Sequence, residues 1–277
     1  MATTKVRYNQ IKTGLPAGGD VNYNNVKLLL KGEGTDGSTS FQDSSIVENS
    51  ISHQSTTTIS TSDYKFGSSS ISFQGSTSAL YFPKNDDVAI STEDFTLETW
   101  YKPTAYNHKY SPILSLGNAW SNISNGLFNY LLYYYPNDNK LGFLSKHGTT
   151  SYRTAIATAT LNLNTWYHIA ATRTNNTLYL FLDGTLISAD TTESWSSVDL
   201  DFTIPANNNF YVGLISQGNY INDALYSFRG YMDNIRITKG VARYTSNFSV
   251  PTAAFPAFES KEGKKMVVGS NGNIDLQ

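Results

Sequence analysis

Residues 166–184 read WYHIAATRTNNTLYLFLDG. Two runs with strict alternation of side chains flank Asn175-Asn176, and the second run ends at Asp183-Gly184. A two-residue period is typical of β-strands. Asn, Asp and Gly tolerate the positive φ that a tight hairpin turn of the primed type requires. The stretch therefore predicts two antiparallel strands joined by a tight turn.

The second run of this stretch is apolar on both of its faces. Three leucines, Leu178, Leu180 and Leu182, alternate with Tyr179 and Phe181. A strand with two apolar faces must be covered on both. We therefore expect this strand near the centre of a sheet.

The same rhythm recurs along most of the chain, in short runs separated by clusters of Gly, Asn, Asp and Ser, without a helical stripe. Between Phe95 and Tyr101 we assign the odd-numbered side chains to the core. Repeated hairpins predict an all-β, antiparallel two-sheet sandwich, which 277 residues can form as one domain. The predicted strands are residues 26–31, 69–73, 79–82, 95–102, 112–116, 128–135, 140–145, 166–174, 178–182, 210–214 and 230–238.

Composition limits the classes of function. Apolar residues make up 39% of the chain and charged residues 15%, and the net charge is -2. Such a chain can bury a core but has no basic stripe for nucleic acid, which is excluded as a partner. The lack of cysteine excludes a disulfide framework, a thiolate zinc site and a cysteine nucleophile. We find neither a secretory signal nor a membrane-spanning run, and expect a chain made in the cytoplasm without membrane insertion.

The two ends fall outside the strand rhythm. Residues 1–25 carry KVRYNQIK and the breaker run LPAGG, which predicts an extended attachment arm before a sandwich of residues 26–258. Residues 259–277 carry the charged linker ESKEGKK and the β-prone tail MVVGSNGNIDLQ. Both segments suit addition as strands to another chain's sheet edge. Disordered termini are the alternative for both.

Seven stretches, in this order, resemble the concanavalin A-like lectin/glucanase superfamily, and most closely the laminin G-like jelly-roll domains found in bacteriophage structural proteins. They are VKLLLKGEGTDGSTSFQDSS, KFGSSSISFQGSTSALYFP, DFTLETWYKP, LNTWYHIAATR, TLYLFLDGTLIS, NNFYVGL and FRGYMDNIRITKGVARYTSNFSVPTAAFP. The resemblance covers the sandwich and not the arms. It implies two curved sheets packed as a jelly roll, and a role in a fibre, a baseplate or head decoration.

Catalysis is tested first, because relatives of this fold include glucanases. The resemblance implies two Glu and an Asp alternating on one strand, which supply the two carboxylates of glycoside cleavage. No such string exists here, and Glu98 has no acidic neighbour two residues away, so we expect it at the surface. His168 in WYHIAATR matches a framework position and is assigned a structural role, while His53 and His147 are expected on the surface. We therefore expect no enzyme activity.

Calcium is the cofactor that the resemblance implies, held at the rim of the sandwich. Calcium binds hard oxygen ligands from carboxylates and loop carbonyls. The loop GEGTDGSTSFQDSS offers Glu33, Asp36 and Asp43, and the late strand GYMDN offers Asp233. Turn formation is the alternative role for these residues, since Asp is common in Gly- and Ser-rich loops.

Tyrosine is abundant, with 19 residues. In YLLYYYPND, Tyr130 and Tyr134 face one side of a strand while Tyr133 and Tyr135 face the other. We expect one pair to be buried and one exposed. Exposed rings stack on sugars or anchor protein interfaces, and packing in the core or against another subunit is the alternative. The candidate carbohydrate-binding residues are Tyr106, His108, Tyr110, Trp120, Tyr133, Tyr135 and Tyr220.

Trp195 is expected as a further loop ring, whereas Trp100 and Trp166 match framework positions and are excluded from the site.

These observations favour a virion structural protein whose domain contacts host-surface polysaccharide. The N-terminal arm would bind other virion proteins, and the chain would form a homo-oligomer, which we expect to be a trimer because tail fibres are generally built so. The alternative is a purely structural decoration module without a glycan ligand. A glycan-cleaving enzyme is the third and least favoured reading.

Overall fold

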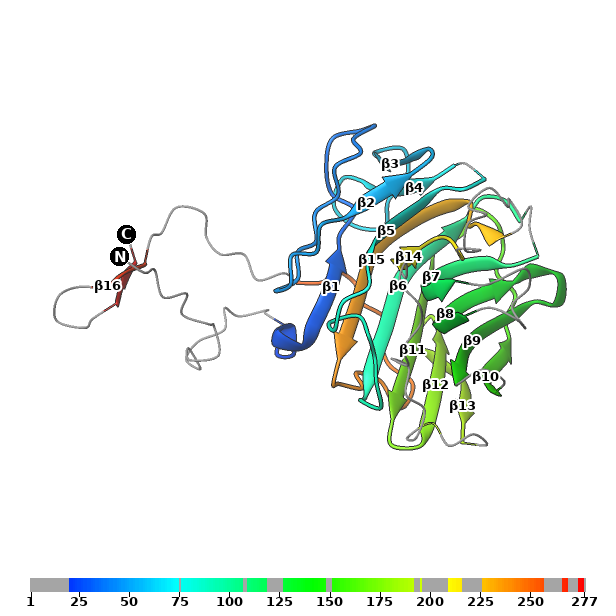
Figure 1. Ribbon diagram of the computed structural model, residues 1–277. Coiled ribbons are helices and arrows are strands. Elements are labelled where there is room, and N and C mark those ends of the chain that lie inside the picture. The colour runs from blue at the N-terminus through cyan, green and yellow to red at the C-terminus, as the bar shows by residue number, and fades with distance from the viewer. Residues whose placement is uncertain are drawn as a thin grey trace.

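The computed structural model describes residues 20–74, 76–106, 109–118, 127–147, 151–191, 195, 209–215, 226–256, 266–268 and 274–276. Two antiparallel sheets pack face to face as a jelly-roll sandwich, which confirms the predicted fold class (Figure 1). A separate pair of short strands, β16 (Met266–Val268) and β17 (Ile274–Leu276), lies near the C-terminus.

The larger sheet, called sheet A, has eight strands in the order β13-β12-β11-β6-β15-β4-β3, and β1 also pairs with β15. Its strands are β1 (Val26–Leu30), β3 (Thr57–Ser60), β4 (Ser70–Phe73), β6 (Phe95–Pro103), β11 (Tyr167–Thr174), β12 (Thr177–Leu182), β13 (Thr185–Asp190) and β15 (Gly230–Lys239).

The other sheet, called sheet B, has seven strands in the order β10-β9-β8-β7-β14-β5-β2. Its strands are β2 (Ser52–Gln54), β5 (Ala79–Pro83), β7 (Ser111–Asn118), β8 (Leu127–Tyr135), β9 (Lys140–His147), β10 (Ser151–Thr158) and β14 (Asn209–Val212). Two short 3-10 helices are η2 (Tyr23–Asn25) and η3 (Pro136–Asp138).

Every strand predicted from the sequence is present, and the opening stretch forms the hairpin of β11 and β12. Asn175 at its turn has φ 51°, and Asp183 and Gly184 have φ 49° and 74° in the next turn. Gly184 also needs to lack a Cβ, because that atom would lie 2.1 Å from the Phe248 carbonyl oxygen. Strands β2, β3, β10 and β13 were not predicted.

The prediction that β12 lies near the centre of its sheet is wrong. It is second from the edge, between β13 and β11. It is nevertheless covered on both faces, because Leu178 and Leu180 enter the core while Phe181 packs against Phe248 with ring centroids 5.3 Å apart.

The core between the sheets contains the predicted face of β6, with Phe95, Leu97 and Tyr101 all fully buried. On β8, Tyr130 and Tyr134 also enter this core, and Tyr133 and Tyr135 lie on the other face, as predicted. The expectation that this second pair is exposed is wrong, because Tyr133 is buried and Tyr135 is half-buried.

A C-terminal segment, residues 241–255, covers the outer face of sheet A, and we call it the strap. Tyr244 and Phe248 of the strap stack with centroids 3.6 Å apart and planes 8° apart. The Phe248 amide donates to the Gly184 carbonyl (2.9 Å), and the Phe255 amide donates to Asn234 Oδ1 (2.7 Å). These contacts bury the second face of sheet A.

The expectation that Glu98 is a surface residue is wrong, because its side chain is fully buried beneath the strap. Arg236 Nη2 lies 2.7 Å from Glu98 Oε1, and the Tyr244 hydroxyl donates to Oε2 (2.9 Å). His168 Nε2 also lies 3.2 Å from Oε2. Burial by itself would raise the pKa of Glu98, but Arg236, then His168 and Arg243, lower it to about 2.

Residues 20–25, which the sequence assigns to the arm, pack onto the sandwich. The Asp20 carboxylate lies 3.0 Å from Arg236 Nη1 and 2.7 Å from Arg243 Nη2. Tyr23 packs with Val26, Leu29 and Phe255 in one apolar cluster. The first and last described parts of the sandwich, residues 20–25 and the end of the strap, therefore lie close together.

Replacing Glu98 by Gln should lower the free energy of unfolding by about 3–5 kcal/mol, because it removes the fully buried counter-ion of Arg236 and leaves Asp20 to pair with both Arg236 and Arg243. Asp87→Asn, which removes a partly exposed partner of Lys27, is the matched control and should cost about 0–1 kcal/mol. Urea unfolding measures both changes. Equal effects of the two variants would show that Glu98 does not hold the strap.

Candidate functional site

Four tyrosines gather on the outer face of sheet B, at one end of its strands, and we call them the tyrosine cluster. Tyr133 and Tyr135 alternate with the core residue Tyr134 along β8. Tyr110 immediately precedes β7. Tyr226 lies beside the residues that follow β14, because the Ile215 amide donates to the Tyr226 carbonyl (3.0 Å). Neighbouring ends of three strands thus bring the rings together.

Tyr110 lies at the centre of the cluster. Its ring is nearly parallel to those of Tyr135 and Tyr226, at 23° in each case, with centroid distances of 5.1 and 5.8 Å. Tyr133 meets it edge-on, at 5.5 Å and 72°. The Lys109 ammonium lies 5.5 Å from the centroid of the same ring. The ring of Tyr110 is therefore in contact with neighbours on several sides.

Gly142 of β9 makes room for the cluster. It lies directly opposite Tyr133, and a Cβ on Gly142 would come within 2.6 Å of Tyr133 Cζ. The Tyr133 ring therefore lies flat across the neighbouring strand. Leu131, Leu144 and Ile215 are buried beneath the cluster and form an apolar floor.

The hydroxyl groups of Tyr110 and Tyr133 remain protonated near neutral pH. Burial raises the pKa of Tyr133 to about 12, with a smaller contribution from Tyr110. Burial also raises the pKa of Tyr110, followed by the effects of Tyr135, Tyr226 and Asp138. Within the described part of the chain, the hydroxyls of Tyr110, Tyr133 and Tyr135 have no hydrogen-bond partner. They can therefore act as donors and acceptors toward a ligand.

The structure brings together Tyr110, Tyr133 and Tyr135 from the predicted site. Tyr106 lies elsewhere: its ring packs against Tyr134 of the core (5.3 Å), and its hydroxyl donates to the Leu161 carbonyl (2.9 Å). The predicted site residues His108, Trp120 and Tyr220 lie outside the described residues.

Two aromatic residues lie in places that the sequence did not predict. Trp195, expected as a loop ring, is fully buried and packs against Phe143 with centroids 6.0 Å apart, so that expectation is wrong. Tyr226 joins the cluster although sequence reasoning missed it. It stands in LYSFRG, where no alternation marks a face.

Three histidines were predicted to lie outside the site. His168 is fully buried among rings that include Trp100 (5.3 Å) and Phe248 (5.7 Å), in keeping with its predicted structural role. His53 is exposed on β2, as expected. The side chain of His147 lies outside the description.

The four acidic residues predicted to bind calcium do not converge. The Asp43 carboxylate is saturated by protein donors, namely the amides of Leu29, Ser45 and Asn49 and the side chains of Ser45 and Asn49. Asp36 accepts from the Thr61 amide (2.9 Å). Within the described ranges, no group of three or more potential ligands could hold a metal. Asp43 therefore does not fit a shared calcium site.

Glu33 lies close enough to Asp233 for its charge to raise the pKa of Asp233. Asp233 Oδ2 accepts from the amides of Lys65 (2.9 Å) and Phe66 (3.0 Å), and Glu33 Oε2 accepts from the Ser68 hydroxyl (3.2 Å). Burial raises the pKa of Asp233 to about 6 against the lowering effect of these amides, and the charge of Glu33 adds to the rise. Both carboxylates thus fix the loop of residues 61–68.

The jelly-roll topology defines an all-β, lectin-like sandwich. The chain belongs to the Concanavalin A-like lectin/glucanases superfamily, whose family description matches residues 74–243. No curated protein matches the chain. Among the described residues, no helix is long and apolar enough to cross a membrane.

Solved structures with the same fold include binding domains of toxins. The binding domain of Paraclostridial Mosquitocidal Protein 1 has a TM-score of 0.57 and 16% identity, over 78% of this chain and 49% of that one. The binding domain of botulinum neurotoxin serotype G has a TM-score of 0.55 and 12% identity, over 79% of this chain and 48% of that one. This chain thus spans about half the length of these toxin domains.

A third structure matches over almost its whole length. Domain 4 of AbnA, an extracellular GH43 arabinanase from Geobacillus stearothermophilus solved in complex with arabinotriose, has a TM-score of 0.54 and 16% identity. The match covers 78% of this chain and 93% of that domain. At these identities the likeness establishes the fold alone.

The free energy of unfolding should fall as the pH rises from about 4 to 7, because the pKa of Asp233 is raised from 3.8 to about 6. A carboxyl group with a raised pKa stabilises the fold at pH values below its pKa in the unfolded chain, and this contribution is lost above its pKa in the folded protein. For Asp233 the contribution is on the order of 2–3 kcal/mol. Comparing urea unfolding of the parent and Asp233→Asn across this range isolates the effect. Parallel pH profiles would exclude Asp233 as the cause.

Proposed function

We propose that this chain is a non-enzymatic virion structural protein of a bacteriophage, of the tail fibre, baseplate or decoration type, whose domain binds glycans of the host surface. The tyrosine cluster carries the proposal. Three of its hydroxyl groups, those of Tyr110, Tyr133 and Tyr135, have no partner among the described residues and lie above an apolar floor. Sugars present the matching combination of hydroxyl groups and apolar C–H faces.

The structural neighbours support a binding role. The arabinanase domain was solved with arabinotriose, and the toxin domains are binding domains. Fold alone does not determine function, so the proposal depends on the tyrosine cluster rather than on these likenesses.

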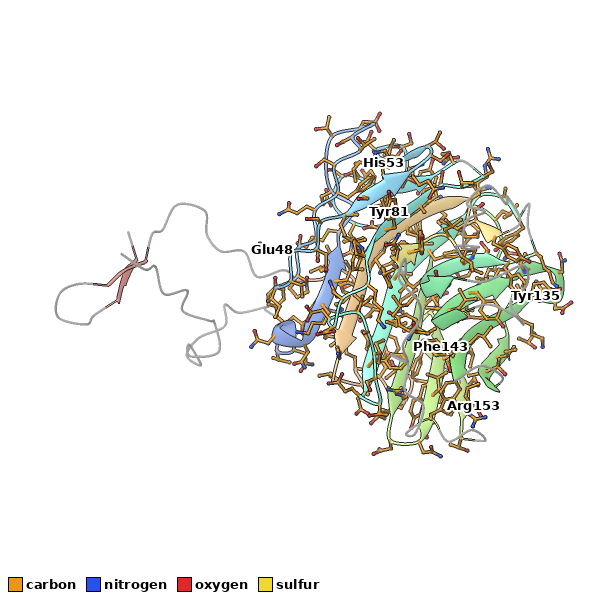
Figure 2. All side chains as sticks on the ribbon, in the orientation of Figure 1. Glu48, His53, Tyr81, Tyr135, Phe143 and Arg153 are labelled. Carbon is orange, nitrogen blue, oxygen red and sulfur yellow. The ribbon has the colours of Figure 1, made fainter. Side chains whose placement is uncertain are left out.

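The position of the chain ends supports display of the domain from a particle. The loop containing Glu48 lies beside the point where residues 20–25 join the sandwich, since the Tyr23 hydroxyl donates to the Ser44 carbonyl (2.6 Å). Figure 2 places Glu48 and Tyr135 at opposite ends of the sandwich. A domain held by its ends would therefore present the tyrosine cluster away from the attachment point.

The proposed attachment uses the N-terminal arm and the C-terminal tail to bind other virion proteins. We propose a homo-oligomer, with a trimer as the expected state. Several copies would convert weak single contacts into firm attachment and firm host binding by avidity.

The absence of catalysis is part of the proposal, and the environment of Glu98 supports it. A glycosidase needs one carboxyl group that is protonated near neutral pH and open to the substrate. Glu98 is fully buried, and its pKa is lowered to about 2. It suits an ion pair rather than proton transfer.

Calcium binding stays a prediction, and Glu33 and Asp233 are the residues that would hold the ion. A cation there would relieve the repulsion between two negative charges and stabilise the folded state by mass action.

A structural module without a glycan ligand is the second candidate. It is favoured by the mutual stacking of Tyr110, Tyr135 and Tyr226, because rings that pack on one another need no further partner.

Replacing Tyr110 by Ala should weaken glycan binding at least tenfold, because Tyr110 contacts every other ring of the cluster. Tyr64→Ala is the matched control, since Tyr64 is an exposed tyrosine outside the cluster. Isothermal titration with host-surface polysaccharides measures binding, and a reducing-end assay on the same mixtures should detect no cleavage. Equal affinity of both variants would remove the cluster from the site, and new reducing ends would contradict the non-enzymatic role.

Deleting residues 1–19 should leave a folded sandwich that no longer joins particles. The deletion keeps Asp20, which holds Arg236 and Arg243, so the melting temperature should stay within a few degrees of the parent's. Incorporation into particles in a complementation assay is the measurement. Normal incorporation would place the attachment surface on the sandwich itself.

A further inference from the structure

The tyrosine cluster differs from a sugar-stacking platform in how its rings are oriented. A platform offers an open ring face to the sugar. Here Tyr110 is nearly parallel to Tyr135 on one side and to Tyr226 on another, and Lys109 lies over the same ring. Tyr133 lies across Gly142. Much of the area of these ring faces therefore packs against other residues of the protein and is not open to a ligand.

The hydroxyl ends of Tyr110, Tyr133 and Tyr135 remain available to a ligand. The Tyr133 residue as a whole is only 6% exposed. Its hydroxyl oxygen, however, is not fully enclosed, since it is not one of the buried polar atoms without a hydrogen-bond partner. Tyr110 and Tyr135 are half-buried, and their hydroxyls also have no partner within the described ranges. Three hydroxyl groups thus share one small area above apolar side chains.

Among the described residues, charges of both signs lie around this area. Lys109 lies at 5.5 Å from the Tyr110 ring, and Asp138 is close enough to influence Tyr110. Lys140 is engaged, because its ammonium donates to the Thr158 hydroxyl (2.7 Å). Recognition of a carboxylate or phosphate normally uses a fixed cation, most often a bidentate arginine. The structure places no arginine in contact with the four rings, as far as the chain is described.

An anionic sugar bound here would lose hydration, which is costly, and would meet only the flexible Lys109 ammonium rather than a bidentate cation. A sugar hydroxyl, in contrast, is both donor and acceptor, as the tyrosine hydroxyl is. We propose that the tyrosine cluster binds an uncharged glycan through the hydroxyl groups of Tyr110, Tyr133 and Tyr135 rather than through stacking on ring faces. This inference rests on the proposed glycan-binding function and specifies the ligand class and the contacts.

Tyr→Phe substitutions separate the two modes of contact, because they remove the hydroxyl and keep the ring. Y110F, Y133F and Y135F should each weaken binding about three- to tenfold, which corresponds to one lost hydrogen bond. Y64F, outside the cluster, is the control and should bind as the parent does. Near-ultraviolet circular dichroism and melting temperature confirm that each variant retains the packed cluster.

The ligand panel pairs neutral with anionic polysaccharides: arabinan, dextran and galactan against polysialic acid, polygalacturonic acid and hyaluronan. The full-length chain is titrated at 20 and 500 mM salt. We expect binding within the neutral group, with less than about a twofold change between the two salt concentrations, because no fixed charge is involved.

Each other outcome has a distinct meaning. Binding of anionic glycans alone, with steep loss in high salt, would overturn this inference and leave the proposed glycan-binding function intact. Unchanged affinity of all three Phe variants, with loss in Y110A, would show stacking on ring faces and overturn the hydroxyl contacts. Failure of every glycan on the panel would contradict the proposed function itself.

Discussion

Glu98 meets Arg236 in the middle of sheet A, where its side chain has no access to water. The pair joins adjacent strands, and Arg236 also holds Asp20 at the start of the sandwich. Tyr244 attaches the strap to the same carboxylate. The outer face of sheet A, the strap and both ends of the domain therefore depend on one buried charge that cannot lose its partners without a large cost.

This arrangement assigns different tasks to the two sheets. Sheet A carries the strap on its outer face, and Asp20 and Phe255, near the two ends of the described sandwich, both contact its strand β15. Sheet B carries the tyrosine cluster on its outer face, with Gly142 allowing Tyr133 to lie flat across the strand. Glu48, beside the start of the described sandwich, and Tyr135 of the cluster lie on opposite sides of the sandwich (Figure 2). The proposed attachment and the proposed recognition would thereby be separated in space within a single domain.

Local periodicity was sufficient to predict the fold, because strands such as β11 and β12 alternate strongly and end in residues that tolerate positive φ. It failed for β10, whose sequence SYRTAIAT mixes small and polar residues on an edge strand. It also failed for Glu98, because the partner Arg236 is 138 positions away and no local pattern reveals it. Alternation along β8 identified two residues of the candidate site, Tyr133 and Tyr135. Tyr226 belongs to a loop, and only the structure shows that it packs with them.

A site built from hydroxyl groups also bears on assembly. Hydrogen bonds to a glycan replace hydrogen bonds to water, so each contributes only about 0.5–1.5 kcal/mol. Three such contacts give weak binding per domain, after the cost of immobilising the ligand is subtracted. Firm host attachment then requires several domains that engage the same surface together. The proposed oligomer and the proposed uncharged ligand therefore support each other, because a low affinity per site is useful only on a particle that presents many sites.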